Sequence, residues 1–322
     1  MHRPDEPRLC RRPAQGRSHP TCRGRHLKPS SSPAPVPPNS AGNPVPPRRP
    51  WPLRPLVAVI AVAPLPGSPR HCDPPSLILS RAVADAETFR DLGVDALLLE
   101  NSYDLPYVKP PLPRTAVLLM TEIAREVRAR FEGPIGIQLL EAANEDALEV
   151  AAAADLDFLR VEGYVFAHIG GAGLIEGCAG RLLRRRRDLG VDHIRVFADL
   201  KKKHCSHALT ADLSIVDELK QAEFFLVDGV VVTGPRTGEP PAVGELERVR
   251  RHASVPVWIG SGITPENLPR YFARADGFIV GSAFRQEGRF LGRVDLQRVE
   301  GFMRVWKRCW QTSPIRREDP IL

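Results

Sequence analysis

The sequence predicts an α/β protein built as a single (β/α)₈ barrel, and three observations predict that fold. Short runs of Val, Ile and Leu recur eight times between residues 56 and 280, separated by stretches with helical spacing of apolar residues. The runs are continuous rather than alternating, as is typical of parallel strands covered on both faces. Eight such strand–helix units in about 250 residues fit the dimensions of this barrel.

The eight strands follow from the apolar runs. An open, doubly wound sheet is the alternative, but its first strand is usually followed by a glycine-rich fingerprint, whereas this chain has Ala63-Pro64-Leu65-Pro66-Gly67 there. We therefore expect a closed barrel. Its strands are expected at residues 56–62, 96–99, 135–139, 158–161, 194–198, 229–232, 255–259 and 278–280.

The helices are predicted from the apolar spacing between the strands. The clearest start signal is Thr264, which can cap a helix that begins at Pro265 and runs to Phe272. Near the end of the chain, Phe302, Met303, Trp306 and Trp310 have helical spacing and are expected to cover the outside of the barrel. Further helices are expected at 78–92, 118–130, 142–153, 174–187, 213–222 and 244–252.

Residues 1–50 differ sharply in composition from the rest of the chain. They hold 13 of the 33 prolines and ten basic against two acidic residues, a net charge of +8, whereas the remaining residues carry a net charge of −1. We expect a disordered, basic, proline-rich tail at 1–50, the barrel at 51–310 and a C-terminal tail at 311–322. The arginines resemble those of a mitochondrial transit peptide, but the prolines oppose its amphipathic helix, so cytoplasmic and mitochondrial locations both stay open.

The composition argues against several classes of protein. No apolar run reaches the roughly 18–20 residues that a membrane helix needs, so we expect a soluble protein without membrane insertion. Six scattered cysteines among 322 residues favour a reducing compartment over a disulfide-stapled domain. Because the basic excess lies in the tail alone, we expect no nucleic-acid partner. A homo-oligomer is compatible with the sequence.

Glycines follow the last two predicted strands, and they point to an anion site. In (β/α)₈ barrels the active site lies at the carboxyl ends of the strands, and the loops after strands seven and eight frequently hold a phosphate. Glycine lets backbone amides approach such an anion closely. Tight turns that need glycine are the structural alternative. The predicted phosphate-binding residues are Gly260, Ser261, Gly262, Gly281 and Ser282.

Polar side chains end most of the other strands and therefore converge on the same rim. An acid beside a lysine can transfer protons or orient the amine for nucleophilic attack. The three successive lysines at 201–203 cannot all point inward, so at least one is expected to be solvated. The predicted catalytic residues are Glu100, Asp199, Lys203 and His204, and the other predicted pocket residues are Asn101, Gln138, Glu162, Thr233 and Gly234.

Metal binding and cysteine catalysis are not expected. His204 and His207 are three residues apart and, with Asp199, offer three metal-binding side chains, but this spacing is common by chance. Cys178 and Cys205 have no evident activating partner. We therefore predict no metal and no cofactor.

Several motifs, taken in order, resemble the BtpA/SgcQ family, and most of all its animal members with Lys-Lys-Lys-His after the fifth strand. The resemblance spans about residues 56–308. The motifs are Leu65-Pro66-Gly67-Ser68-Pro69, Glu100-Asn101, Gly173-Leu174-Ile175-Glu176-Gly177, Phe197-Ala198-Asp199, Lys203-His204, Val232-Thr233-Gly234, Thr237-Gly238, Gly260-Ser261-Gly262-Ile263-Thr264-Pro265-Glu266-Asn267 and Ala275-Asp276-Gly277-Phe278-Ile279-Val280-Gly281-Ser282.

The resemblance implies a barrel of the ribulose-phosphate-binding type. It does not imply a particular reaction, because the family has no settled one. The family name refers to a bacterial role in photosystem I biogenesis. Family members often have a His at the end of the first strand, where this chain has Ala61, and an Asp or Glu where it has Ala172. If either group transfers protons, this chain binds without turnover. By matching positions, the pocket would be lined by Glu100, Asn101, Asp199, Lys203, His204, Thr233, Gly260, Ser261, Gly262, Gly281 and Ser282.

Two functional hypotheses result. In the first, the protein binds a small phosphorylated metabolite, a sugar or nucleoside phosphate, and catalyses an isomerase- or lyase-type reaction with Lys203 as an electrophile or Schiff-base former. The alternative is a non-catalytic assembly or biogenesis factor for a protein complex, which would explain Ala61. A third interpretation, nucleic-acid binding through the tail, predicts a salt-dependent interaction that is lost without residues 1–50. Whether the chain is an enzyme stays open at this stage.

Overall fold

The computed structural model describes residues 51–289 and 292–314, which form a closed barrel of parallel strands. Around the barrel the strands follow the order β1-β10-β9-β8-β7-β4-β3-β2, so each strand–helix unit lies beside the next one along the chain. The predicted (β/α)₈ fold is confirmed. The barrel strands are β1 (Leu56–Ala61), β2 (Ala96–Glu100), β3 (Ile135–Gln138), β4 (Phe158–Val161), β7 (Arg195–Leu200), β8 (Gly229–Val232), β9 (Val257–Ile259) and β10 (Gly277–Val280).

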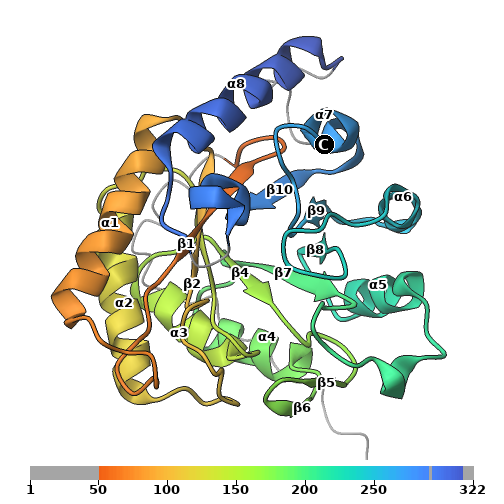
Figure 1. Ribbon diagram of the computed structural model, residues 1–322. Helices are drawn as coiled ribbons and strands as arrows, with labels where there is room; N and C mark the ends of the chain where they lie inside the picture. Colours follow the sequence, from red (N-terminus) through yellow and green to blue (C-terminus); the bar gives the residue numbers. More distant parts are fainter. Residues whose placement is uncertain (1–50, 290–291, 315–322) are drawn as a thin grey trace, which may run out of the picture. The chain divides into compact units, whose positions relative to one another are not determined.

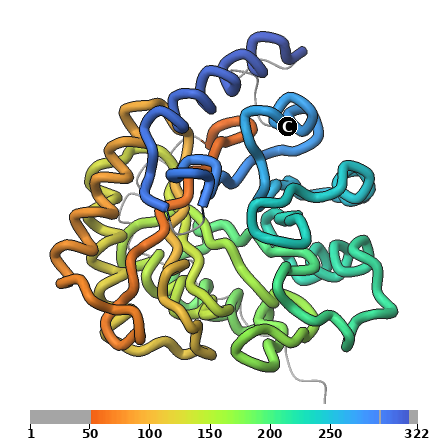
Figure 2. Tube along the Cα trace, in the orientation of Figure 1, coloured from red at the N-terminus to blue at the C-terminus, as the bar shows by residue number. Residues whose placement is uncertain are grey.

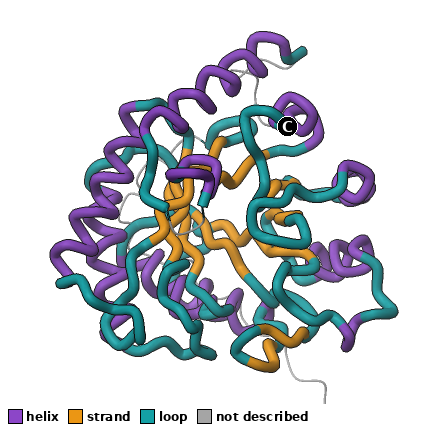
Figure 3. The backbone as a smooth tube through the Cα atoms, in the orientation of Figure 1, coloured by secondary structure: helices purple, strands orange, loops and turns teal. Residues whose placement is uncertain are grey.

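Helices surround the strands, as Figure 1 shows. Along the tube of Figure 2 the colours pass around this ring from orange to blue in sequence order, and Figure 3 shows the strands of the barrel inside the ring of helices. The helices are α1 (Pro75–Asp91), α2 (Arg114–Arg128), α3 (Asn144–Ala153), α4 (Ala179–Asp188), α5 (Ile215–Phe224), α6 (Val243–His252), α7 (Leu268–Tyr271) and α8 (Leu296–Thr312).

Large aromatic side chains fill the interior of the barrel near the end where the strands begin. Phe197 of β7 and Trp258 of β9 are buried and stack with their ring centroids 3.9 Å apart. Phe158 of β4 meets the Trp258 ring edge-on at 5.5 Å. Glycine on a neighbouring strand leaves the space for one of these rings, since a Cβ at Gly136 would lie 2.3 Å from the ring of Phe158. The interior also contains Val57, Val59, Ala96, Leu98, Val231 and Ile279.

Trp51 completes this aromatic cluster from outside the strands. Its ring centroid lies 5.6 Å from that of Phe158, 6.1 Å from that of Phe197 and 6.0 Å from that of Trp258. The guanidinium of Arg195 lies 4.6 Å from the Trp51 ring centroid, within the range of a cation–π contact. The folded barrel therefore includes residue 51, before its first strand.

Two predicted helices begin three or more residues later than expected. The helix predicted from residue 174 begins at Ala179, because the preceding residues form a hairpin of β5 (His168–Gly170) and β6 (Gly173–Ile175). The helix predicted from Pro265 begins at Leu268. The Asn267 side chain accepts a hydrogen bond from the Thr264 amide at 2.9 Å, so Thr264 lies in a turn rather than at the helix cap.

The last helix covers the outside of the barrel, as the spacing of its apolar residues predicts. Phe302, Met303 and Trp306 of α8 are buried, and Trp310 packs against the core. The helix ends at Thr312, two residues beyond the predicted end of the barrel at residue 310. The tail predicted at 1–50 and most of the tail predicted at 311–322 lie outside the described residues.

Candidate functional site

A pocket of about 310 Å³ lies at the end of the barrel where the strands finish. All the predicted catalytic and phosphate-binding residues line it, together with two of the other predicted pocket residues. These residues come from the ends of β2, β3, β4, β7, β9 and β10 or from the loops that follow. They are Glu100, Gln138, Glu162, Asp199, Lys203, His204, Gly260, Ser261, Gly262, Gly281 and Ser282.

The three remaining predicted residues do not line the pocket but support its walls. Asn101 is fully buried; its amide donates to the carbonyl of Leu140 at 3.2 Å and accepts from the Leu140 amide at 2.7 Å. Thr233 packs against Gly260, where a Cβ would lie 2.8 Å from its methyl group. Gly234 lies so close to the Glu239 carbonyl that a Cβ there would be 2.1 Å from the oxygen.

The alternation of side chains along the strands explains why these polar groups meet. Side chains two residues apart on a strand share a face. Phe158 and Phe197 fill the barrel interior, so Arg160 and Asp199, two residues further along β4 and β7, face the same interior one layer nearer the pocket. Leu98 and Glu100 repeat this relation on β2. A charged layer thus lies on an apolar one.

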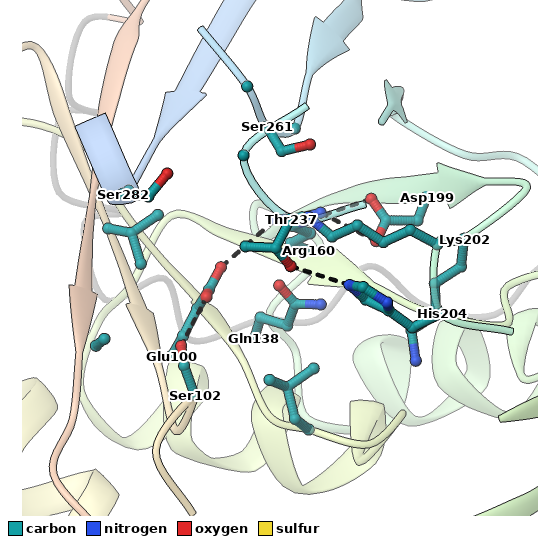
Figure 4. Close-up of a pocket in the computed structure, with 18 of the residues that line it drawn as sticks. Glu100, Ser102, Gln138, Arg160, Asp199, Lys202, His204, Thr237, Ser261 and Ser282 are labelled. Atoms are coloured by element: carbon teal, nitrogen blue, oxygen red, sulfur yellow. Dashed lines mark hydrogen bonds and ion pairs between the residues drawn. The ribbon is translucent and has the colours of Figure 1, made fainter. Parts of the chain in front are cut away.

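Arg160 lies at the centre of this charged layer, between two carboxylates (Figure 4). Its Nε donates to Asp199 Oδ1 at 3.1 Å and its Nη2 to Asp199 Oδ2 at 3.2 Å, while Nη1 lies 3.5 Å from Glu100 Oε1. The Ser102 hydroxyl donates to the other oxygen of Glu100 at 2.9 Å. All three charged side chains are buried. Glu100 and Asp199 are thereby held in fixed positions by one guanidinium.

A second buried cation, Lys202, joins two further carboxylates. Its Nζ lies 2.6 Å from Glu141 Oε1 and 3.0 Å from Glu162 Oε2. Glu141 also accepts from the amides of Gly171 and Ala172, so it ties the β5–β6 hairpin to the pocket. Burial would raise the pKa of Glu141, but these donors hold its pKa below the ordinary value. The same carboxylates raise the pKa of Lys202 against the effect of burial.

Two groups in the pocket are poised to exchange protons near neutral pH. Burial raises the pKa of Glu162 to about 7, although Lys202 partly opposes the shift. Burial and the nearby Arg160 charge lower the pKa of Lys203 to about 8. A group whose pKa lies near the working pH is an effective proton donor or acceptor.

The histidines that follow β7 have different neighbours. His204 is exposed, and its Nε2 lies 2.9 Å from the Thr237 hydroxyl in the loop after β8 (Figure 4). His207 turns away, with its Nε2 2.8 Å from the carbonyl oxygen of Lys202. Within residues 51–289 and 292–314, no group of three or more His, Cys, Asp or Glu side chains is arranged to hold a metal ion.

Cys178 and Cys205 do not line the pocket, and their thiols are poor nucleophiles. Burial raises the pKa of the Cys178 thiol to about 12 and that of Cys205 to about 11. The Asn144 amide also donates to Cys178 Sγ at 3.3 Å. Because the thiolate is the reactive form, neither side chain is activated for attack at neutral pH.

Backbone amides are available on the opposite side of the pocket. The amides of Ser261, Gly262, Gly281 and Ser282 donate no hydrogen bond to any other described residue. Gly262 has φ of 78°, and a Cβ there would lie 2.1 Å from the backbone of Glu239, so only glycine fits. Figure 4 shows Ser261 and Ser282 on this side, across from Glu100 and Gln138.

The structure adds pocket residues that the sequence did not single out as site residues. Arg285 is buried at 3% exposure, donates to the carbonyl of Val59 at 3.0 Å, and forms no ion pair with any described carboxylate. Tyr107 lines the pocket from the β2–α2 loop. Arg160 and Glu141 lie near strand ends that the sequence predicts to reach the rim, Lys202 belongs to the run of three lysines, and Thr237 lies in one of the family motifs. The other residues gave no signal. The residues concerned are Arg160, Lys202, Glu141, Ser102, Tyr107, Thr237 and Arg285.

Comparison with known proteins identifies the family to which this chain is similar. The profile of the BtpA family matches residues 53–308. A mitochondrial protein of Caenorhabditis elegans is 41% identical over 257 residues, covering 78% of this chain and 92% of the relative. The photosystem I biogenesis protein BtpA of Synechocystis is 31% identical over 265 residues, covering 81% and 91% of the two chains.

Solved structures share the fold at low sequence identity. Thiamine phosphate pyrophosphorylase from Pyrococcus furiosus is similar with a TM-score of 0.50 and 13% identity, covering 79% of this chain and 96% of the other. No helix among the described residues is long and apolar enough to cross a membrane. The family profile spans residues 53–308 and the relatives match about four fifths of the chain, so the chain belongs to the BtpA family.

Proposed function

We propose that this protein binds a small phosphorylated metabolite, a sugar or nucleoside phosphate, in the pocket at the ends of its barrel strands. The observation that carries the proposal is the group of four backbone amides, at residues 261, 262, 281 and 282, that have no acceptor among the described residues. Ser261 is buried and the other three residues are half-buried, and a phosphate would supply several acceptor oxygens to their amides at once. The name of the Pyrococcus enzyme with the same fold includes a phosphate ester, which agrees with this choice.

The charges around the pocket favour the same orientation of the ligand. Arg285 follows the Gly281-Ser282 loop and lines the pocket. Its Nη1 and Nη2 donate to the carbonyls of Gly292 and Val59, each at 3.0 Å, so it would attract a phosphate by its positive charge rather than by these two nitrogens. The carboxylates of Glu100, Asp199 and Glu162 lie on other strands and would repel the phosphate from their side. The rest of the ligand would therefore extend toward the acidic groups.

The acidic side supports an isomerase- or lyase-type reaction, because both need groups that remove and deliver protons. Glu162 and Lys203 have pKa values of about 7 and 8, so each can take up or release a proton at neutral pH. Glu100 and Asp199, held by Arg160, would bind and orient hydroxyl groups of the ligand. His204 would act at the pocket mouth, where it contacts Thr237.

The proposal is tested by thermal unfolding of the full-length protein with ribose 5-phosphate, AMP, inorganic phosphate and unphosphorylated ribose. A ligand at 100 times its Kd adds about 2.7 kcal/mol, a Tm rise on the order of 5–10 °C for a domain of this size. Ser282→Asp would place a negative charge at the phosphate and abolish the shift, whereas the matched variant Ser282→Ala keeps the amide and the shift.

A phosphorylated probe that raises Tm no more than ribose does would overturn the proposal. That result would favour the alternative, a non-catalytic assembly factor, which agrees with the name of the Synechocystis relative. Affinity capture with the full chain would then be the next experiment.

We also propose a mitochondrial location, because the Caenorhabditis elegans relative is mitochondrial. Imaging of the full chain fused to a fluorescent protein, compared with a fusion that lacks residues 1–50, tests this directly. Mitochondrial signal from the first fusion alone would support the proposal, and cytoplasmic signal from both would overturn it.

A further inference from the structure

The three consecutive lysines after β7 have different environments. Lys201 Nζ donates to the carbonyl of Thr210 at 3.2 Å, outside the pocket. Lys202 is buried between two carboxylates. Lys203 lines the pocket, yet its ammonium has no hydrogen bond or ion pair with any described residue. Lys201 has φ of 44°, a turn that sends the three side chains in different directions. Lys203 is therefore the lysine of the three that is available to a ligand.

The surroundings of Lys203 favour its neutral form. Burial and the Arg160 charge disfavour the ammonium, while Asp199 and Glu100 partly offset them, which leaves the pKa at about 8. About one tenth of the side chain is then the free amine at pH 7, against fewer than about one in a thousand for a lysine with its ordinary pKa. A neutral amine in a partly desolvated pocket is a nucleophile for carbonyl carbon.

We propose that Lys203 forms an imine with the open-chain carbonyl of an aldose or ketose phosphate, an inference that rests on the proposed phosphate site. The amine nitrogen attacks the carbonyl carbon, and the carbonyl oxygen takes a proton to give a carbinolamine. The nitrogen then loses a proton, the hydroxyl takes one and leaves as water, and the C=N bond forms. The product is the protonated imine, so one proton is taken up overall and water is the sole by-product.

A titratable carboxyl within electrostatic reach of Lys203 can move these protons. Glu162 titrates near neutral pH and contributes to the electrostatic environment of Lys203. Its carboxylate is held by Gln138 Nε2 at 3.0 Å and by the Ala142 amide at 3.2 Å, so its position is fixed. A general acid–base group beside the amine would serve both the addition and the loss of water. The pocket, at about 310 Å³, suits a ligand of sugar-phosphate size.

The test is reductive trapping on the full-length protein. Ribose 5-phosphate or ribulose 5-phosphate is added with sodium borohydride, which reduces an imine to a stable secondary amine. We expect a mass increase equal to one sugar phosphate less one oxygen atom, located by peptide mapping at Lys203. Lys203→Met should abolish this adduct, and Lys203→Arg, which keeps the positive charge, should abolish it too. Lys307→Met, which removes an exposed lysine of α8, should leave it unchanged.

The outcomes separate the two proposals. If ribose 5-phosphate raises Tm but no adduct forms at residue 203, the imine is refuted and the phosphate site stands. If no sugar phosphate raises Tm or forms an adduct at residue 203, both proposals fail. An adduct spread equally over exposed lysines, and unchanged in Lys203→Met, reflects surface chemistry and also refutes the imine. Circular dichroism of each variant establishes that it is folded.

Discussion

Replacing Arg160 by Met should destabilise the barrel far more than loss of a surface arginine. The guanidinium is the shared partner of Asp199 and Glu100, and the three side chains are 7%, 2% and 11% exposed. Removing one member of a buried ion pair costs about 3–5 kcal/mol, because the remaining charge is left without compensation. Met keeps most of the aliphatic volume, so packing contributes little. Glu100 keeps its hydrogen bond from Ser102, so most of the cost arises at Asp199.

Arg187→Met is the matched control. Arg187 of α4 is 80% exposed and pairs with Asp192 at 2.7 Å, a surface ion pair for which we expect at most about 1 kcal/mol. Chemical denaturation of the full-length proteins at pH 7, followed by far-UV circular dichroism, measures both free-energy changes. If Arg160→Met costs no more than Arg187→Met, the electrostatic reasoning about the pocket is wrong.

A double variant tests whether the stability lost in Arg160→Met arises from the unpaired charge of Asp199. Adding Asp199→Asn to Arg160→Met removes the carboxylate that the first substitution left unpaired. We expect the double variant to recover part of the lost stability, giving a coupling free energy of about 1–3 kcal/mol between the two positions. No recovery would show that Arg160 stabilises the barrel by packing rather than by charge.

Three further predictions follow from other parts of the structure. Trp51→Ala should lower stability in urea denaturation by about 2–4 kcal/mol, because it removes the ring that completes the aromatic cluster of the barrel; a loss under 1 kcal/mol would contradict that role. Gly262→Ala should reduce both Tm and ribose 5-phosphate binding, whereas Gly281→Ala, whose Cβ would lie 3.5 Å from Val59, should keep Tm within about 2 °C of the parent. Because the pKa of Glu162 is raised in the folded state, the protonated carboxyl stabilises the fold at low pH, and this contribution of up to about 3 kcal/mol is lost as pH rises from about 4.5 to 7. The unfolding free energy of Glu162→Gln, measured by denaturation across that pH range, should not show this loss. Identical pH profiles for the variant and the parent protein would contradict the role of Glu162.

The strands and their order could be predicted because a strand that is buried on both faces needs a continuous apolar run, and such a run is visible in the local sequence. The hairpin at 168–175 could not, since its two strands are three residues each and mix apolar with glycine positions. For the same reason the fourth helix was predicted to begin too early. The turn at Thr264 was missed because Asn267, a residue typical of helix caps, bonds backward to the Thr264 amide instead.

Most pocket residues could be predicted because they follow the ends of strands. Which of these side chains form hydrogen bonds or ion pairs with one another could not be predicted. Lys202 and Lys203 line the pocket whereas Lys201 does not, and Lys201 has a left-handed φ of 44° that its residue type does not predict. The pairing of Lys202 with Glu141 joins residues 61 positions apart across two loops. Contacts of this kind depend on how loops fold over the barrel rather than on any local pattern.

The buried charged layer indicates that the pocket has a functional role. Buried ion pairs contribute little net stability, and apolar residues of similar volume often replace them without loss. One layer below, Phe158, Phe197 and Trp258 show that this barrel readily fills its interior with apolar side chains. Arg160 and Asp199, placed directly above such residues, are therefore not explained by folding. Fixed charges on one side of the pocket, and on the other side amides that have no acceptor among the described residues, suit a polar ligand with one anionic end.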